Sequence, residues 1–147
     1  MTSIAQCGLI ILLSGFLILH LCILLKIIPY NLVWGGRLQS DKEMIRFELV
    51  SIAVNLFFLF IVFIQSNLLK LDFPPLGITI ALWVMTALFV LNTFGNALSK
   101  NKIEQRLFTP ITILLVIFSA VLAWTNTWRS DSGKNYWLKE EVLIKHY

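Results

Sequence analysis

The chain has 147 residues, of which 58% are hydrophobic and 14% are charged, and its formal net charge is +4. A mean hydropathy of +0.81 and a charged fraction well below the quarter that is usual in soluble domains indicate a single integral membrane domain. The basic residues stand in short tracts beside apolar runs, as is typical of side chains that face lipid headgroups. We therefore expect no nucleic-acid partner.

Four apolar runs are long enough for membrane-spanning helices, which need about 20 residues at about 1.5 Å each. We predict these helices over residues 7–28, 41–69, 75–97 and 110–128. Ser40 and Glu43 have the spacing of a capping box, which predicts that the second helix begins near residue 41. Thr109 followed by Pro110 is typical of a helix N-cap and first turn. The sequence thus predicts an all-α fold, a four-transmembrane-helix bundle.

The predicted transmembrane domain covers residues 1–129, and a polar, amphipathic C-terminal tail covers 130–147. Within this tail we expect a break at 130–133 and a short interfacial helix over 135–147. The loops between helices 1 and 2 (loop 1) and between helices 3 and 4 (loop 3) hold most of the basic residues of the membrane domain. The positive-inside rule therefore predicts that loops 1 and 3 are cytoplasmic, although the basic residues of the tail would then lie outside.

Polar side chains inside the spans should face the bundle interior, because unpaired polar groups in hydrocarbon cost several kcal/mol. Helical periodicity gives each of the last three helices one polar or small-residue face. These faces consist of Glu48, Ser51 and Asn55, of Asn92, Asn96 and Ser99, and of Thr112, Ser119 and Ala123.

The depth of these residues predicts one polar cluster that opens toward loops 1 and 3. His20 lies eight residues before the predicted end of helix 1, and Asn55 lies eight residues after helix 2 enters lipid, which places both at one level about 12 Å deep. Glu48 lies closer to the loops. The candidate ligand-binding residues are His20, Arg37, Glu48, Ser51, Asn55, Asn92, Asn96 and Thr112.

The same residues have a purely structural interpretation. Membrane bundles use Asn, Ser, Thr and His as hydrogen-bonding contacts between helices, and Glu48 could pair with Arg46 or Arg106. Arg37 follows Trp-Gly-Gly, which indicates an interfacial turn or a contact with a phosphate or another anionic group. We expect no metal site and no cofactor, since the second histidine, His146, is in the tail and zinc needs three or four ligands.

A late histidine in helix 1, a Trp-Gly-Gly turn, Asn-x-x-Gly in helix 3 and a proline opening helix 4 occur here as His20, 34–36, 92–95 and Pro110. This pattern resembles small bacterial four-span integral membrane proteins of unknown function. The resemblance implies a four-helix domain in a bacterial cytoplasmic membrane and implies no particular chemistry.

Three functions fit these observations, and the sequence does not decide whether the protein is an enzyme. The leading hypothesis is a non-catalytic protein that binds a membrane lipid or a partner protein through the polar cluster, since no complete catalytic constellation is present. The second is a membrane enzyme that acts on a lipid-like substrate with Glu48 and His20 as an acid–base pair. The third is a homo-oligomeric transporter or channel subunit.

Overall fold

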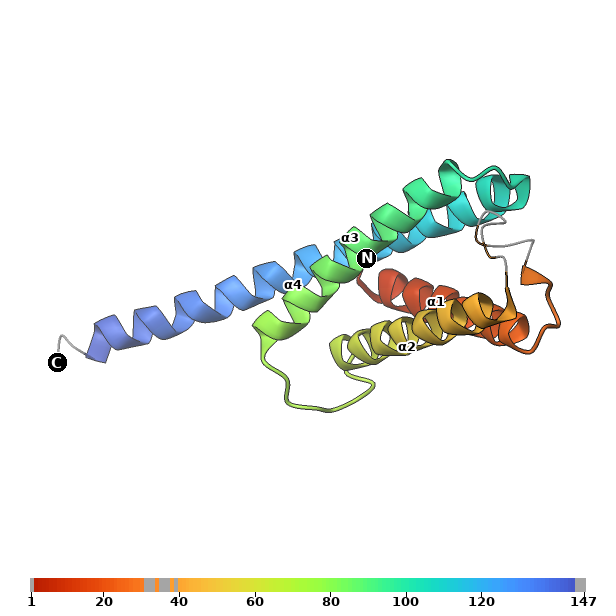
Figure 1. The fold of residues 1–147 in the computed structure, drawn as a ribbon. Helices are drawn as coiled ribbons and strands as arrows, with labels where there is room; N and C mark the ends of the chain where they lie inside the picture. Colours follow the sequence, from red (N-terminus) through yellow and green to blue (C-terminus); the bar gives the residue numbers. More distant parts are fainter. Residues whose placement is uncertain (1, 31–33, 35–37, 39, 145–147) are drawn as a thin grey trace.

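The computed structural model describes residues 2–30, 34, 38 and 40–144, with side chains as far as Trp128. Its elements are α1 (Thr2–Leu24), α2 (Asp41–Gln65), α3 (Pro75–Ala97), the π-helix η3 (Glu104–Phe108) and α4 (Thr109–Ile144) (Figure 1). The described residues contain no strand, so the all-α prediction is confirmed. Four stretches of 23 to 25 residues, with mean hydropathies of 1.9 to 2.6, are long and apolar enough to cross a membrane.

The outer surface of the helices is apolar. On α1, Ile4, Ile11 and Ile18 recur every seven residues and are 70%, 69% and 61% exposed. Soluble monomers rarely expose large contiguous apolar surfaces, whereas membrane helices present such surfaces to lipid tails. The surface is therefore suited to a multi-pass integral membrane protein.

The helices form two pairs, α1 with α2 and α3 with α4 (Figure 1). The pairs are joined mainly by α1 against α4, whereas α2 and α3 have few contacts with each other. The α1–α4 approach is close at Gly8, where a methyl group would overlap the ring of Phe118. The bundle is consequently tight along the α1–α4 seam and loose between α2 and α3.

The two ends of the bundle are built differently. The end that contains the start of α1 and the end of α2, which we call the dense end, holds the main hydrophobic core, where Leu9, Val62, Leu82 and Leu122 are completely buried. At the opposite end, which we call the open end, α1 stops, α2 starts and η3 leads into α4. There the buried apolar cluster is small and is centred on Ile23.

The first two helices end earlier than predicted. Helix α1 covers Thr2–Leu24 instead of 7–28, and α2 covers Asp41–Gln65 instead of 41–69. Lys26 and Asn67 take left-handed backbone conformations, with φ of 59° and 57°, which close the two helices as C-terminal caps do. The predicted start of α2 is confirmed, because the Ser40 hydroxyl accepts a 3.3 Å hydrogen bond from the Glu43 amide.

Helix α3 has the predicted bounds, but both ends of the fourth helix differ from the prediction. Thr109 is helical, with φ −57° and ψ −52°, and is not an N-cap, because η3 continues directly into α4. A π-helical turn accommodates Pro110, which cannot donate the regular intrahelical hydrogen bond. The break expected at 130–133 is also absent, since α4 continues to Ile144 without a proline to stop it. The division into a domain and a tail stays a prediction.

Candidate functional site

A cavity of about 610 Å³ occupies the open end. Its walls are mainly apolar and come from α1, α2, α3, η3 and α4, with Leu13, Phe58, Phe89 and Leu115 toward the dense end. The polar and indole-bearing residues of the lining are His20, Trp34, Ser51, Asn55, Asn92, Asn96 and Glu104. Cavities of this size with a few converging polar groups are typical of small-molecule sites.

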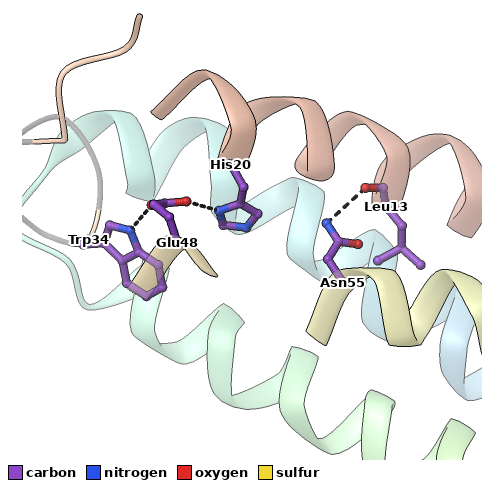
Figure 2. A network of polar contacts seen from close by, with 5 residues as sticks. All are labelled: Leu13, His20, Trp34, Glu48 and Asn55. Atoms are coloured by element: carbon purple, nitrogen blue, oxygen red, sulfur yellow. Dashed lines mark hydrogen bonds and ion pairs between the residues drawn. The ribbon is translucent and has the colours of Figure 1, made fainter. Parts of the chain in front are cut away.

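Glu48 is the centre of a hydrogen-bonded group beside this cavity (Figure 2). Its Oε2 atom lies 2.7 Å from His20 Nδ1 on α1, and its Oε1 accepts a 2.7 Å hydrogen bond from Trp34 Nε1 in loop 1. Glu48 is completely buried, so both carboxyl oxygens need such partners. The prediction of an Arg46 or Arg106 partner is therefore replaced by His20 and Trp34.

Local structure places each member of this group. Helix α2 starts at Asp41, so Glu48 lies two turns inside it, and His20 lies one turn before the end of α1. Trp34 has a φ of 60°, unusual for a bulky residue, and its ring lies 5.2 Å from that of Phe47. A backbone strained in this way is kept only where surrounding contacts require it, here the contacts with Glu48 and Phe47.

Asn55 is the second polar contact between α1 and α2 and lies on the cavity wall (Figure 2). Its Nδ2 donates a 3.1 Å hydrogen bond to the Leu13 carbonyl oxygen. Asn55 is only 6% exposed. Its Oδ1 is buried and has no hydrogen-bond partner among the described residues. Most buried polar atoms are paired, so this acceptor is an exception at the site.

The prediction that His20 and Asn55 lie at one level is wrong. His20 is opposite Glu48, and Asn55 is opposite Leu13, seven residues deeper on both helices (Figure 2). The earlier end of α1, at Leu24 and not at residue 28, moves His20 about 6 Å closer to the open end and accounts for more than half of this offset of about 10 Å.

The structure brings most of the predicted residues to the cavity. His20, Ser51, Asn55, Asn92 and Asn96 line it, and Glu48 is buried outside the lining, in hydrogen-bond contact with His20. Thr112 is completely buried but hydrogen-bonds to carbonyl oxygens of its own helix, at Phe108 and Thr109, and is not part of the lining. Arg37 lies outside the described residues. The ligand-binding role of this set stays a prediction.

Two lining residues were not among the candidates. Trp34 belongs to the Trp-Gly-Gly turn and Glu104 to the charged loop 3, yet both line the cavity and Glu104 is only 5% exposed. The π-helical geometry of η3, which turns Glu104 inward, has no clear sequence signal apart from the downstream Pro110. For Trp34 the nearby Gly-Gly pair indicated a turn but not the direction of the indole.

The charges near the open end are arranged in two layers. Outside the cavity, Lys26 Nζ donates a 2.6 Å hydrogen bond to Asp41 Oδ2, and this bond is the main reason why the pKa of Lys26 is raised above 10.5. At the cavity the ionisable side chains of the described residues are His20, Glu48 and Glu104. No lysine or arginine is among the described lining residues.

Chemically, the site can bind a molecule with one apolar part and one hydrogen-bonding part. A carboxylate that holds an imidazole is also the arrangement used in general acid–base catalysis. Among the described residues, no three His, Cys, Asp or Glu side chains are grouped so that they could hold a metal ion.

Comparison of the chain with protein-family models, with curated protein sequences and with solved structures gives no match.

Proposed function

We propose that this multi-pass membrane protein binds a lipid-like amphiphile in the cavity at the open end. The observation that carries the proposal is the cavity of about 610 Å³, whose apolar walls are interrupted by His20, Asn55, Asn92 and Asn96. Apolar walls suit a hydrocarbon chain, and a few placed polar groups orient a headgroup.

A purely structural role accounts for some of these polar groups but not for all. Asn55 Nδ2 and the His20–Glu48 contact do join α1 to α2, as interhelical hydrogen bonds commonly do. Asn92, however, is exposed on the cavity wall, and Asn55 Oδ1 has no partner among the described residues. Stability alone does not require polar groups at these places, whereas a bound molecule would use them.

The proposal is tested by filling the cavity. Ser51→Phe adds a bulky ring at the cavity wall, while Ala53→Phe adds the same ring two residues away on an exposed, non-lining position of α2. The full-length proteins are solubilised gently, and copurified lipids are measured by mass spectrometry. We expect Ser51→Phe to lose the lipid that wild type and Ala53→Phe retain.

Equal lipid retention in the two variants, or no stoichiometric lipid in the wild type, would contradict the proposal. Circular dichroism and the unfolding midpoint of both variants provide the folding control.

A second candidate function is favoured by the 2.7 Å contact between His20 and Glu48. If the protein is a membrane enzyme acting on a lipid-like substrate, His20 on the cavity wall would transfer the proton and the enclosed Glu48 would hold the imidazole. Turnover of the copurified lipid by wild type, lost in His20→Gln with lipid binding retained, would favour this function.

We also propose, from charge distribution and resemblance, that the protein lies in a bacterial cytoplasmic membrane with loops 1 and 3 in the cytoplasm. In that orientation the site opens toward the cytoplasmic side. Accessibility of cysteines introduced in loop 2 to a membrane-impermeant reagent tests the orientation. A homo-oligomer or a protein partner at the lipid-facing surface stays a prediction.

A further inference from the structure

We infer that the ligand is a lipid of the surrounding bilayer that inserts one acyl chain into the cavity between α2 and α3, with the chain directed toward the dense end and the polar head left near the open end. This inference rests on the proposed function and specifies the source of the lipid, its route and its orientation. It requires no particular head group.

The exposed part of the described cavity lining lies on two helices. The described lining residues from α1, loop 1, η3 and α4 are buried or half-buried. Helices α2 and α3 have few contacts with each other, and the two helix pairs diverge toward the open end (Figure 1). The cavity therefore opens between α2 and α3. The exposed lining residues are Phe47, Val50, Val54, Leu88, Leu91, Asn92 and Gly95.

This opening is suited to contact with lipid tails. Both helices that border it are long and apolar enough to cross a membrane. At its edges Val50 of α2 is 60% exposed and Leu91 of α3 is 66% exposed. Apolar side chains at such exposure are favourable against hydrocarbon and unfavourable against water. An acyl chain can thus enter from the bilayer without passing through water.

Toward loop 1 the cavity is covered by apolar side chains. The cluster centred on Ile23 includes Trp34, which also lines the cavity. The 2.7 Å hydrogen bond to Glu48 Oε1 fixes the indole of Trp34 in this position. Ile28 and Tyr30, which follow the end of α1, extend the cluster beyond the lining. A ligand from the aqueous phase would have to displace these contacts, whereas a lipid that enters between α2 and α3 would leave them intact.

The polarity of the lining changes with depth as it does within one leaflet of a bilayer. Helix α3 runs toward the open end, so Asn92 and Asn96 lie closer to that end than Leu88 does. Phe58 and Leu115 form an apolar wall toward the dense end. A lipid can therefore keep its orientation as it enters, with its head near the asparagines and its chain against the apolar wall. The reverse orientation would bury the head among apolar side chains at a cost.

The test uses two photoactivatable phosphatidylethanolamines that differ only in the position of a diazirine. The tail probe carries the diazirine at the methyl end of one acyl chain, and the head-side probe carries it next to the glycerol. The full-length protein is reconstituted in vesicles of phosphatidylethanolamine and phosphatidylglycerol that contain one of the probes. After illumination, mass spectrometry locates the crosslinked residues.

The expected labelling follows from burial. The tail probe should label Leu13, Phe58 and Leu115, which line the cavity and are only 2%, 5% and 1% exposed, so that lipid outside the cavity does not reach them. We call these three residues the buried wall. The head-side probe should instead label Phe47 and Asn96, which lie nearer to the open end.

Two variants of α3 examine the opening. Leu91→Trp adds bulk at its edge, and Val84→Trp places the same side chain about two turns earlier on nearly the same face, at a 51% exposed residue outside the lining. Labelling of the buried wall by the tail probe is divided by labelling of Ile11, which is 69% exposed outside the lining. Leu91→Trp should lower this ratio at least about fivefold, and Val84→Trp should leave it unchanged.

The outcomes separate the inference from the proposed function. If neither probe labels the buried wall of the wild type, although lipid copurifies and is lost in Ser51→Phe, the inference is overturned and the proposed function stands. The absence of both labelling and copurified lipid would overturn both.

The route and the orientation can also fail separately. Equal ratios in Leu91→Trp and Val84→Trp would overturn the route, and labelling of the buried wall by the head-side probe alone would overturn the orientation. Circular dichroism shows whether the variants fold. If Leu91→Trp does not, Val50→Trp on the other edge takes its place, with Leu49→Trp, at a 53% exposed residue outside the lining, as its control.

Discussion

The two ends of the bundle use the same four helices for different purposes. At the dense end, completely buried side chains such as Leu9, Leu82 and Leu122 fill the space between the helices. At the open end, a volume of about 610 Å³ is left between them, and the polar residues gather there. Membrane helices associate through close packing and not through expulsion of water, so unfilled volume lowers stability. The contrast between a densely packed end and an end with a cavity supports our proposal that the open end binds a ligand.

The largest loss of stability should come from a substitution in the core of the dense end. Leu82→Ala removes a completely buried side chain of the core and should lower the free energy of unfolding by about 2–5 kcal/mol. Leu88→Ala, one to two turns along the same helix, shortens a 42% exposed cavity wall residue and should cost less than about 1 kcal/mol. Unfolding in mixed micelles with increasing sodium dodecyl sulfate measures both. Equal costs would remove the contrast between the two ends.

The next largest difference in the free energy of unfolding should be between alanine substitutions of two glycines, Gly8 and Gly95. Gly8→Ala adds a methyl group that overlaps Phe118 at the α1–α4 seam and should cost about 1–3 kcal/mol. Gly95→Ala at the cavity wall meets no atom within 4 Å and should be neutral or stabilising by up to about 1 kcal/mol, since alanine is the better helix former. The same unfolding assay applies. If the double variant Gly8→Ala with Phe118→Leu fails to recover part of the loss, the overlap is not the cause.

The smallest change in stability should come from removing the exposed ion pair between Lys26 and Asp41 at the open end. Lys26→Gln removes the hydrogen bond to Asp41, and because both side chains are more than half exposed we expect no large change in the unfolding midpoint. The pKa of Lys26 is raised in the folded state, so its contribution is fully present at neutral pH and is lost as the pH rises through that raised pKa, above 10.5.

The pH dependence of this pair is checked by measuring the difference in midpoint between wild type and Lys26→Gln from pH 7 to pH 11. Lys42→Gln, another exposed lysine, provides the control for general charge effects. A difference that grows with pH would show that the sign is wrong.

The fold could be predicted from the sequence because a membrane-spanning helix requires a long run of apolar residues, which hydropathy detects directly. Runs of about twenty apolar residues predicted the four helices. Pro75 occupies the first turn of α3, where proline is favoured. Helical periodicity also placed Ser51, Asn55, Asn92 and Asn96 on the inner faces that line the cavity.

The details of the site could not be predicted because they depend on where helices end and on backbone partners. The end of α1, four residues earlier than predicted, moves His20 away from the level of Asn55 and toward Glu48. The left-handed conformation of Lys26, which closes this helix, is rare for a lysine. The π-helical turn that buries Glu104 is equally rare. Asn55 donates its hydrogen bond to the backbone carbonyl oxygen of Leu13. Every residue has such a carbonyl group, so the sequence does not indicate which one is the partner.

Helix α4 starts next to the cavity, at Thr109, and runs without interruption to Ile144 (Figure 1). Its 36 residues measure about 54 Å at about 1.5 Å per residue, whereas a hydrocarbon core is about 30 Å thick. The helix is thus longer than a hydrocarbon core is thick, and its first residue lies at the cavity while its last lies far from it. A tilt of α4 by about 5° about Thr109 would displace Ile144 by about 5 Å, so a small rearrangement at the cavity would become a larger displacement at the far end of the helix.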